Sequence, residues 1–415
     1  MAISILQKPY GFTPAQSPIV FSVLESTQAY TSSEFQYTAN LYIWSGTQSQ
    51  SGSYLYQARK FPNPSGSGIF DFSKFINSTL TDLTATNDSN IKYYKAEFGF
   101  QYYTSSTNSY VTQSGGLTPV TCSTGGTMFK AYDGYNLFPN PINTTLYTSD
   151  PYWPFMTDMG SVTQSVQSTD VSNLGNGVRG VALWVGANDT SYPTLIAATC
   201  SYQNGSINQS AISLSNLTAS TTTSLQTYQF GAAPGDASGI IPITNGGSAL
   251  AKYKLQAYSG SVVLSTLNYV IQNECYYTPV RVVYKNRFGQ FDFFNFYKRH
   301  NDQFNTEQRL YQPQIGTWES STLSYNQFQT SQQRYIVDAT QVLECNTNYL
   351  SDGYNELMKQ LLVSDEIYWL FDQANSIVKP LTIKTNSLQF KTGVNNKLIQ
   401  YTIAFDIGQP YKLLL

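Results

Sequence analysis

Charge is scarce in this chain. Only 12% of its 415 residues are Asp, Glu, Lys or Arg, about half the share of roughly 25% that is usual in soluble domains. The formal net charge is −2, and no run of Lys or Arg forms a basic stripe. Specific nucleic-acid binding depends on such a stripe, so the composition argues against nucleic acid as a partner.

Cysteine and histidine are also rare. The four cysteines, Cys122, Cys200, Cys275 and Cys345, lie too far apart for a metal site and are too few for a disulfide framework. The single histidine, His300, cannot build a multi-histidine metal site. We therefore expect no metal and no cofactor.

Long apolar runs are missing as well. None approaches the length of a membrane span, and the start "MAISILQKPYGF" has no segment typical of a signal peptide. The sequence therefore predicts no membrane association and no export signal.

The motifs of common enzymes are absent or out of context. Gly175, Gly177 and Gly180 form a literal GxGxxG, but a β-type run follows it where a dinucleotide site needs a helix. No G-x-S-x-G elbow occurs. We predict that the chain is not an enzyme and has no catalytic residue. A polysaccharide hydrolase stays an alternative, because its two carboxylates need not be neighbours in sequence.

Aromatic residues are plentiful, and they alternate with polar ones. Aromatics make up 15% of the chain, including 33 Tyr. Apolar residues recur at every second position in 35–43 and again in 94–102, which is typical of strands with one buried face. Pro and Gly between these segments lead into a short helix expected to begin near Ser73.

This pattern predicts a mainly β fold of β-sandwich domains with a few short helices. We expect a β-rich N-terminal domain (1–117), a β-rich middle region with Ser/Thr-rich loops (118–248) and a C-terminal β-sandwich-like domain (249–415). The C-terminal part is predicted to be α+β, with one amphipathic helix (352–362) against an antiparallel sheet. A second short helix is expected from Ser364 or Asp365 to Trp369, and a polar loop before residue 334.

The segment "VVYKNRFGQFDFFNFYKRH" (282–300) predicts a hairpin with aromatic side chains on both faces. Gly289 stands between the arms, where a tight turn needs positive φ. One face would pack in the chain's own core, and the other against a neighbouring protein or the helix at 352–362. The interface candidates on this hairpin are Tyr284, Phe294, Phe296, Lys298 and Arg299.

Two blocks of the chain resemble a known family. "CYYTPVRVVYKNRFGQFDFFNF", "RYIVDATQVLECNTNYLSDGYNELMKQLLVSDEIYWL" and "KPLTIKTNSLQFKTGVNNKLIQYTIAFDI" are similar to segments of virion structural proteins of tailed phages that infect Bacteroidota, crAss-like phages included. The amino-terminal "KFPNPSGSGIFDFSKFI" resembles the opening domain of the same proteins. Together the two blocks cover about two-thirds of the chain.

The resemblance implies a non-enzymatic tail or neck component. Its partners would be further copies of itself, as a homo-oligomeric ring or adaptor, and other virion tail or neck proteins. Such a protein is made in the cytoplasm of the bacterial host and ends in the virion. Rings form when a heterologous contact closes on itself.

A host-recognition module is the alternative from another class. In that case Trp44, Trp153 and Trp184 would stack on surface glycans. Trp in a β domain is more often part of a core or an interface, and no fibre-type repeat is present.

Overall fold

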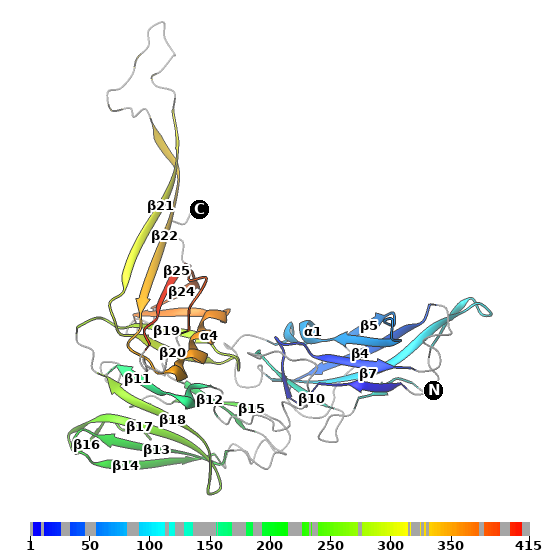
Figure 1. Ribbon diagram of the computed structural model, residues 1–415, viewed down its shortest axis with the longest axis horizontal. Coiled ribbons are helices and arrows are strands. Elements are labelled where there is room, and N and C mark those ends of the chain that lie inside the picture. Colours follow the sequence, from blue (N-terminus) through cyan, green and yellow to red (C-terminus); the bar gives the residue numbers. More distant parts are fainter. Residues whose placement is uncertain are drawn as a thin grey trace. The chain divides into compact units, whose positions relative to one another are not determined.

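The computed structural model describes residues 3–9, 12–25, 34–45, 55–80, 91–112, 116–120, 128–135, 155, 157–167, 180–185, 193–214, 226–231, 234, 240–272, 276–313, 316, 324, 328, 332–372, 377–390 and 399–408. Over these residues the fold is mainly β with a few short helices, as predicted (Figure 1). The helices are α1 (Ser73–Asn77), α4 (Asn355–Val363) and the 3-10 turns η2 (Met159–Ser161) and η3 (Asp352–Tyr354). In the described part of the chain, no helix has the length and apolar character needed to cross a bilayer.

The chain divides into two compact units. One unit is Met1–Asn273 with Lys285–Asp292, and the other is Glu274–Tyr284 with Phe293–Leu415. The tip of the aromatic hairpin therefore belongs to the first unit, while the rest of the hairpin belongs to the second.

The first unit begins with a β-sandwich. One layer has the order β1-β3-β6, from Ser4–Gln7, Val20–Leu24 and Ser67–Asp71. The other has the order β2-β10-β7-β4-β5, from Phe12–Pro14, Phe129–Tyr132, Ile91–Thr104, Gln36–Trp44 and Tyr56–Lys60, with β8 (Ser109–Thr112) and β9 (Thr118–Pro119) added on β7.

Aromatic side chains fill the space between the two layers. Phe21 of β3 is fully buried, with its ring centroid 5.5 Å from that of Phe98 and 5.6 Å from that of Phe129 in the facing sheet. Tyr37 and Leu41 of β4 lie in this core, as the alternation predicts. Thr38 and Asn40 on the opposite face of β4 are buried as well, but the apolar side chains are on the face that packs between the two layers.

A second core lies in the same unit. Its sheet has the order β11-β18-β17-β13-β14, from Thr163–Gln167, Val262–Gln272, Ser248–Ser259, Leu195–Tyr202 and Ile207–Ser213, with β16 (Thr244–Asn245) on β17. The rings of Tyr253 and Tyr269 stack at 4.5 Å in it. A separate pair joins β12 (Gly180–Val185) and β15 (Gln226–Gly231). Gly180 thus begins a strand, whereas the glycine-rich loop of a dinucleotide site leads into a helix.

The sheets divide the chain at other positions than the predicted boundaries. The boundary at 117/118 falls before β9 and β10, which both pair with β7. The boundary at 248/249 falls within β17, the partner of β16 and β13. Pairing over long sequence separations, which local patterns do not record, assigns these strands to their sheets.

The second unit contains a seven-stranded sheet. Its order is β20-β19-β23-β24-β25-β22-β21, from Phe291–Phe296, Val280–Lys285, Ile367–Asp372, Ile377–Ile383, Thr402–Ile407, Gln333–Asn346 and Asn301–Tyr311. Helix α4 buries Leu357, Met358 and Leu361, as its helical spacing predicts.

Two predictions for this unit are wrong. The segment expected to be a second helix is β23, in which Ile367 and Trp369 are buried at alternate positions. Ser364 caps no helix, because its hydroxyl donates to the carbonyl of Glu366. The segment expected to be a polar loop is in part β21, whose residues are almost all exposed and so lack a period-2 pattern.

Truncation of Phe21 tests the packing between the two layers of the sandwich. We expect Phe21→Ala to lower the free energy of unfolding by about 3–5 kcal/mol, because it leaves a cavity between two sheets. The matched control is Ile69→Ala on β6, whose side chain is 47% exposed; it should change stability by about 0.5 kcal/mol or less. Urea titration measures both, and equal effects would contradict the described core.

Candidate functional site

The aromatic residues proposed as an interface are already covered within one chain. Tyr284 and Phe296 are fully buried, and Phe294 is 7% exposed. Phe294 packs edge-on against Tyr354 of η3 at 6.2 Å, and Phe296 packs against Phe405 of β25 at 6.0 Å. The cover on the second face comes from the same chain, so these three side chains have little surface left for a neighbouring protein.

The two basic candidates have a different setting. Lys298 and Arg299 follow β20 and precede β21, with Lys298 half-buried and Arg299 exposed. The Arg299 carbonyl accepts a hydrogen bond from Asn346 Nδ2 at 2.9 Å, which ties this corner to β22. Their role at an interface stays a prediction. His300, next in the chain, is half-buried as well.

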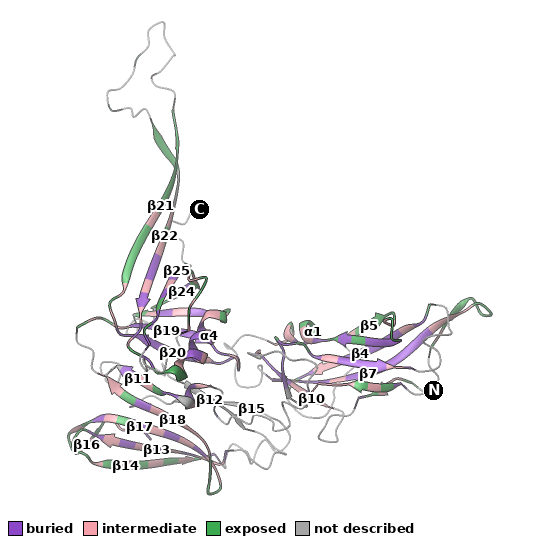
Figure 2. Ribbon diagram, in the orientation of Figure 1, coloured by how far each residue is buried: buried purple, intermediate pink, exposed green. Residues whose placement is uncertain are grey.

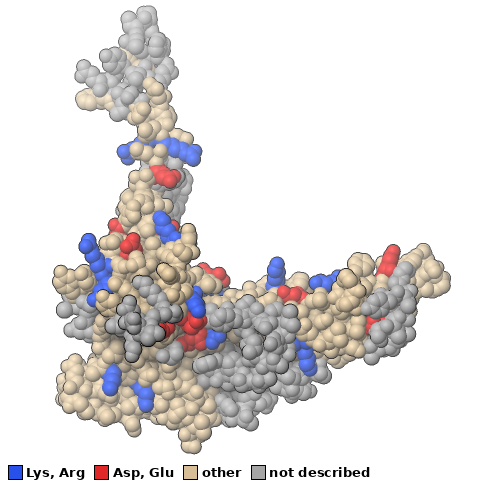
Figure 3. All heavy atoms as spheres, viewed as in Figure 1, with Lys and Arg blue, Asp and Glu red and all other residues tan. Residues whose placement is uncertain are grey.

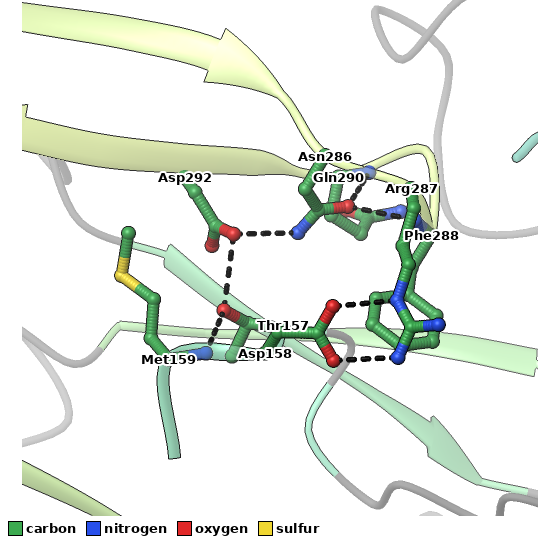
Figure 4. A network of polar contacts seen from close by, with 8 residues as sticks. All are labelled: Thr157, Asp158, Met159, Asn286, Arg287, Phe288, Gln290 and Asp292. Carbon is green, nitrogen blue, oxygen red and sulfur yellow. Dashed lines mark hydrogen bonds and ion pairs between the residues drawn. The ribbon is translucent and has the colours of Figure 1, made fainter. Parts of the chain in front are cut away.

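The hairpin tip is a three-residue loop, and Asn286 organises it. The Asn286 and Gln290 backbones pair at 2.7 Å, and Gly289 N–H donates to the Asn286 carbonyl at 3.0 Å. Asn286 Oδ1 accepts from the N–H groups of Phe288 and Gln290 (Figure 4). Gly289 has φ +73°, as predicted for this position. This is a turn followed by a left-handed residue, a common form of hairpin loop.

Residues 133–135 of the same unit lie directly against this turn. Tyr135 N–H donates to the Arg287 carbonyl at 3.0 Å. A Cβ added to Gly289 would lie 1.8 Å from the backbone oxygen of Asp133, and one added to Gly134 would lie 2.2 Å from that of Arg287. Only glycine permits the two backbones to approach so closely.

Charged and polar side chains surround the tip. Lys285 Nζ lies 2.7 Å from Asp133 Oδ2, with both side chains nearly buried. The Arg287 guanidinium holds both oxygens of Asp158, at 2.5 and 2.6 Å (Figure 4). A buried charge costs free energy unless it is paired. These pairs therefore specify one position for the tip in the unit.

Asp292 is the most perturbed group of the cluster. Its Oδ2 accepts hydrogen bonds from Thr157 Oγ1 and Asn286 Nδ2, each at 3.0 Å. Burial raises the pKa of Asp292 to about 7, against the lowering effect of these two bonds. Both hydrogen-bond donors are side chains of this chain, so the arrangement holds the turn in place. It gives no sign of a position for a substrate.

The described residues offer no sign of metal chemistry. No group of three or more His, Cys, Asp or Glu among them could hold a metal ion. Cys200 and Cys345 are buried free thiols; Cys122 and Cys275 lie outside the described residues.

Trp44 is 8% exposed and stacks on Tyr93, so it offers no surface on which a sugar could stack. Trp153 and the Trp184 side chain are not described.

A hollow of about 250 Å³ opens on the sandwich of the first unit. Its lining includes Thr38, Gln57, Arg59, Gln101 and Thr112. The amides of Gln57 and Gln101 already bond to Asn40 and Gln36 on the same sheet. These two amides in the lining therefore already have partners within the sheet, and the hollow carries no assignment of a ligand.

The second unit carries an exposed ribbon formed by β21 and β22. β22 pairs with β25 only through Val342–Asn346. We call residues 306–311 and 333–339 the arm: among the described strands they pair only with each other (Figure 1). Figure 2 shows β21 exposed over most of its length.

The arm carries large apolar side chains in exposed positions. Leu310 is 46% exposed, Tyr311 is 45% exposed and Tyr335 is 54% exposed. The two tyrosine rings meet edge to face at 6.1 Å. Sequence reasoning missed this surface because a strand exposed on both sides has no alternation. Its β-forming residues (Phe304, Thr306 and Tyr311) were the one available signal.

Comparisons with known proteins add little. No family model and no curated protein matches the chain. Among solved structures, the native conformation of E. coli alpha-2-macroglobulin determined by cryo-EM aligns with 83% of this chain and 21% of that chain, at 9% identity and a TM-score of 0.21. A likeness of that size supports no conclusion on fold or function.

Replacing Phe296 separates a core role from an interface role. We expect Phe296→Ala to lower the free energy of unfolding by about 3–5 kcal/mol, because the ring is fully enclosed. The control is Phe304→Ala, at a side chain that is 50% exposed. Chemical denaturation measures both. If Phe296→Ala kept full stability and instead reduced self-association, the ring would belong to an interface after all.

The raised pKa of Asp292 predicts a pH-dependent stability. The folded protein binds this proton more tightly than the unfolded chain, so the contribution of Asp292 to stability should be fully present below the ordinary pKa of 3.8 and be lost as pH rises to about 7. Each pKa unit corresponds to about 1.4 kcal/mol, so the loss is on the order of a few kcal/mol. Asp292→Asn, which cannot ionise, should remove this slope.

The matched control is Asp365→Asn, at an exposed carboxylate. Urea titrations from about pH 4 to about pH 8 would measure the slope of each protein. An unchanged slope in Asp292→Asn would show that Asp292 is not the group responsible.

Proposed function

We propose that this chain is a non-enzymatic structural component of a phage virion, in the tail or neck. It acts through contacts with further copies of itself and with neighbouring virion proteins. The assignment to a phage virion is supported by the resemblance of two blocks of the sequence to virion structural proteins. The proposal that the chain acts through such contacts rests on the arm of β21 and β22.

The arm supports this function because an isolated two-stranded ribbon is marginally stable in water. Its exposed Leu310, Tyr311 and Tyr335 add apolar area that a contact could cover. Tyrosine and uncharged polar residues are favoured at interfaces because they bury area without desolvating ions. A scarcity of charge over the whole chain fits the same role.

Charges of both signs lie along the ribbon in Figure 3. On β21 these are Asp302, Glu307 and Arg309, all exposed. Mixed charge on an exposed arm favours partner selection and orientation over non-specific attraction.

Removing the arm tests the proposal. Asn305 and Thr340 face each other in the register, so residues 306–339 can be replaced by Asn-Gly, which closes a two-residue hairpin. We expect the wild type to exceed the monomer mass of 46.2 kDa in light scattering as concentration rises. The armless variant should keep its unfolding transition and need about tenfold or more concentration to associate.

Two outcomes would count against this function. A wild type that stays at the monomer mass at every concentration would contradict self-association. An armless variant that associates as well as the wild type would show that the contact lies elsewhere on the chain.

A further inference from the structure

Strand β21 forms one edge of the seven-stranded sheet. It pairs with β22 from Asn301 to Tyr311 on one side, and no described strand pairs with its other side. The strand at the opposite edge, β20, is largely buried. An unpaired edge presents a row of N–H and C=O groups that a further strand can complete.

This edge has only part of the usual protection against pairing. β21 runs for 11 residues without Pro or Lys, but it carries the exposed charges of Asp302, Glu307 and Arg309, and charged side chains are among the features that block an edge. The irregularity of the arm lies on the partner strand: Arg309 faces Ile336 and Leu310 faces Arg334, so Tyr335 is the extra residue. A bulge twists and disrupts its own strand. β21 thus keeps a regular edge, and β22 does not.

The charges on β21 are self-complementary about Gln308. Glu307 precedes this residue and Arg309 follows it, and both are exposed. If two β21 strands run antiparallel with their Gln308 residues opposite each other, each Glu307 faces the Arg309 of the other copy. Opposite charges directly across two strands stabilise pairing, and like charges destabilise it.

We propose that two copies of this chain associate by antiparallel pairing of their β21 edges, centred on Gln308. Thr306 then faces Leu310 of the second copy. Another register, which would place Arg309 opposite Asp302, leaves Glu307 facing Phe304. The Gln308 register is therefore favoured, because it pairs both charges that β21 contributes to the arm, Glu307 and Arg309.

This inference rests on the proposed function and names the partner of the arm. The contact is two-fold, with the same surface on both copies, and it closes at two copies. A larger assembly of these dimers would need a second contact elsewhere on the chain.

Charge reversal tests the pairing in the full chain. Glu307→Arg places Arg opposite Arg, and Arg309→Glu places Glu opposite Glu. Each variant alone should dimerise about tenfold or more weakly than the wild type in sedimentation or light scattering. Mixing the two variants should restore the dimer, because every contact between them is again opposite in charge. The double variant Glu307→Arg/Arg309→Glu should dimerise by itself.

A cysteine at the two-fold axis tests the register without changing charge. In the proposed dimer the two Gln308 Cα atoms lie about 4.5–5.5 Å apart, within the range of a disulfide. Gln308→Cys should therefore form a covalent dimer under mild oxidation. Thr306→Cys on the same face is the control, because its two copies would be roughly 14 Å apart. The wild type shows any background from the chain's own thiols.

The outcomes separate this inference from the proposed function. Restoration by mixing, together with selective cross-linking at residue 308, supports the β21 pairing. If the wild type associates but charge reversal has no effect and Gln308→Cys does not cross-link, the pairing is overturned while self-association stands. If the wild type does not associate at all, both are overturned.

Discussion

The close approach of two backbones at the hairpin tip is the constraint on which this fold depends most. A Cβ at Gly289 would lie 1.8 Å from a backbone oxygen, and a Cβ at Gly134 would lie 2.2 Å from another. Both distances are far shorter than a van der Waals contact, so only glycine fits at these two positions. The turn at Asn286 shapes the tip, and the pairs of Lys285 with Asp133 and of Arg287 with Asp158 hold it. The tip thus belongs to the first unit although its strands continue into the second.

Several of the chain's few charged residues lie at this same turn. A chain with 12% charged residues concentrates several of them around one buried turn. Breaking one partner of such a pair leaves a buried charge uncompensated, which costs far more than the pair contributes. The cluster therefore favours one conformation of the tip more than it adds to overall stability. Asp292, held by Thr157 and Asn286, has the same role.

The segment richest in aromatic residues is not the segment that is exposed for contact with a partner. Phe294 and Phe296 are packed by Tyr354 and Phe405 of the same chain. The surface that stays open is the less apolar strand β21, whose side chains alternate in no regular way. The aromatic side chains of the hairpin are buried by other parts of the same chain. The strand that remains exposed carries both apolar and polar side chains, as most protein interfaces do.

The sequence by itself determined the mainly β class, strands in the segments 35–43 and 94–102, the helix after Ser351 and the glycine turn at 289. Each of these follows from local periodicity or from the conformation of one residue, which neighbours in sequence are enough to specify. The resemblance of two sequence blocks to virion structural proteins is the basis of the proposed function.

Only the tertiary structure decided the remainder. It assigned β17 and β18 to the sheet of β13, made a strand of 367–372, buried the hairpin's second face and left β21 exposed. The physical reason is the same in each case. Whether a strand face or edge is covered depends on residues tens to hundreds of positions away, and periodicity records that a face is apolar without recording what packs on it.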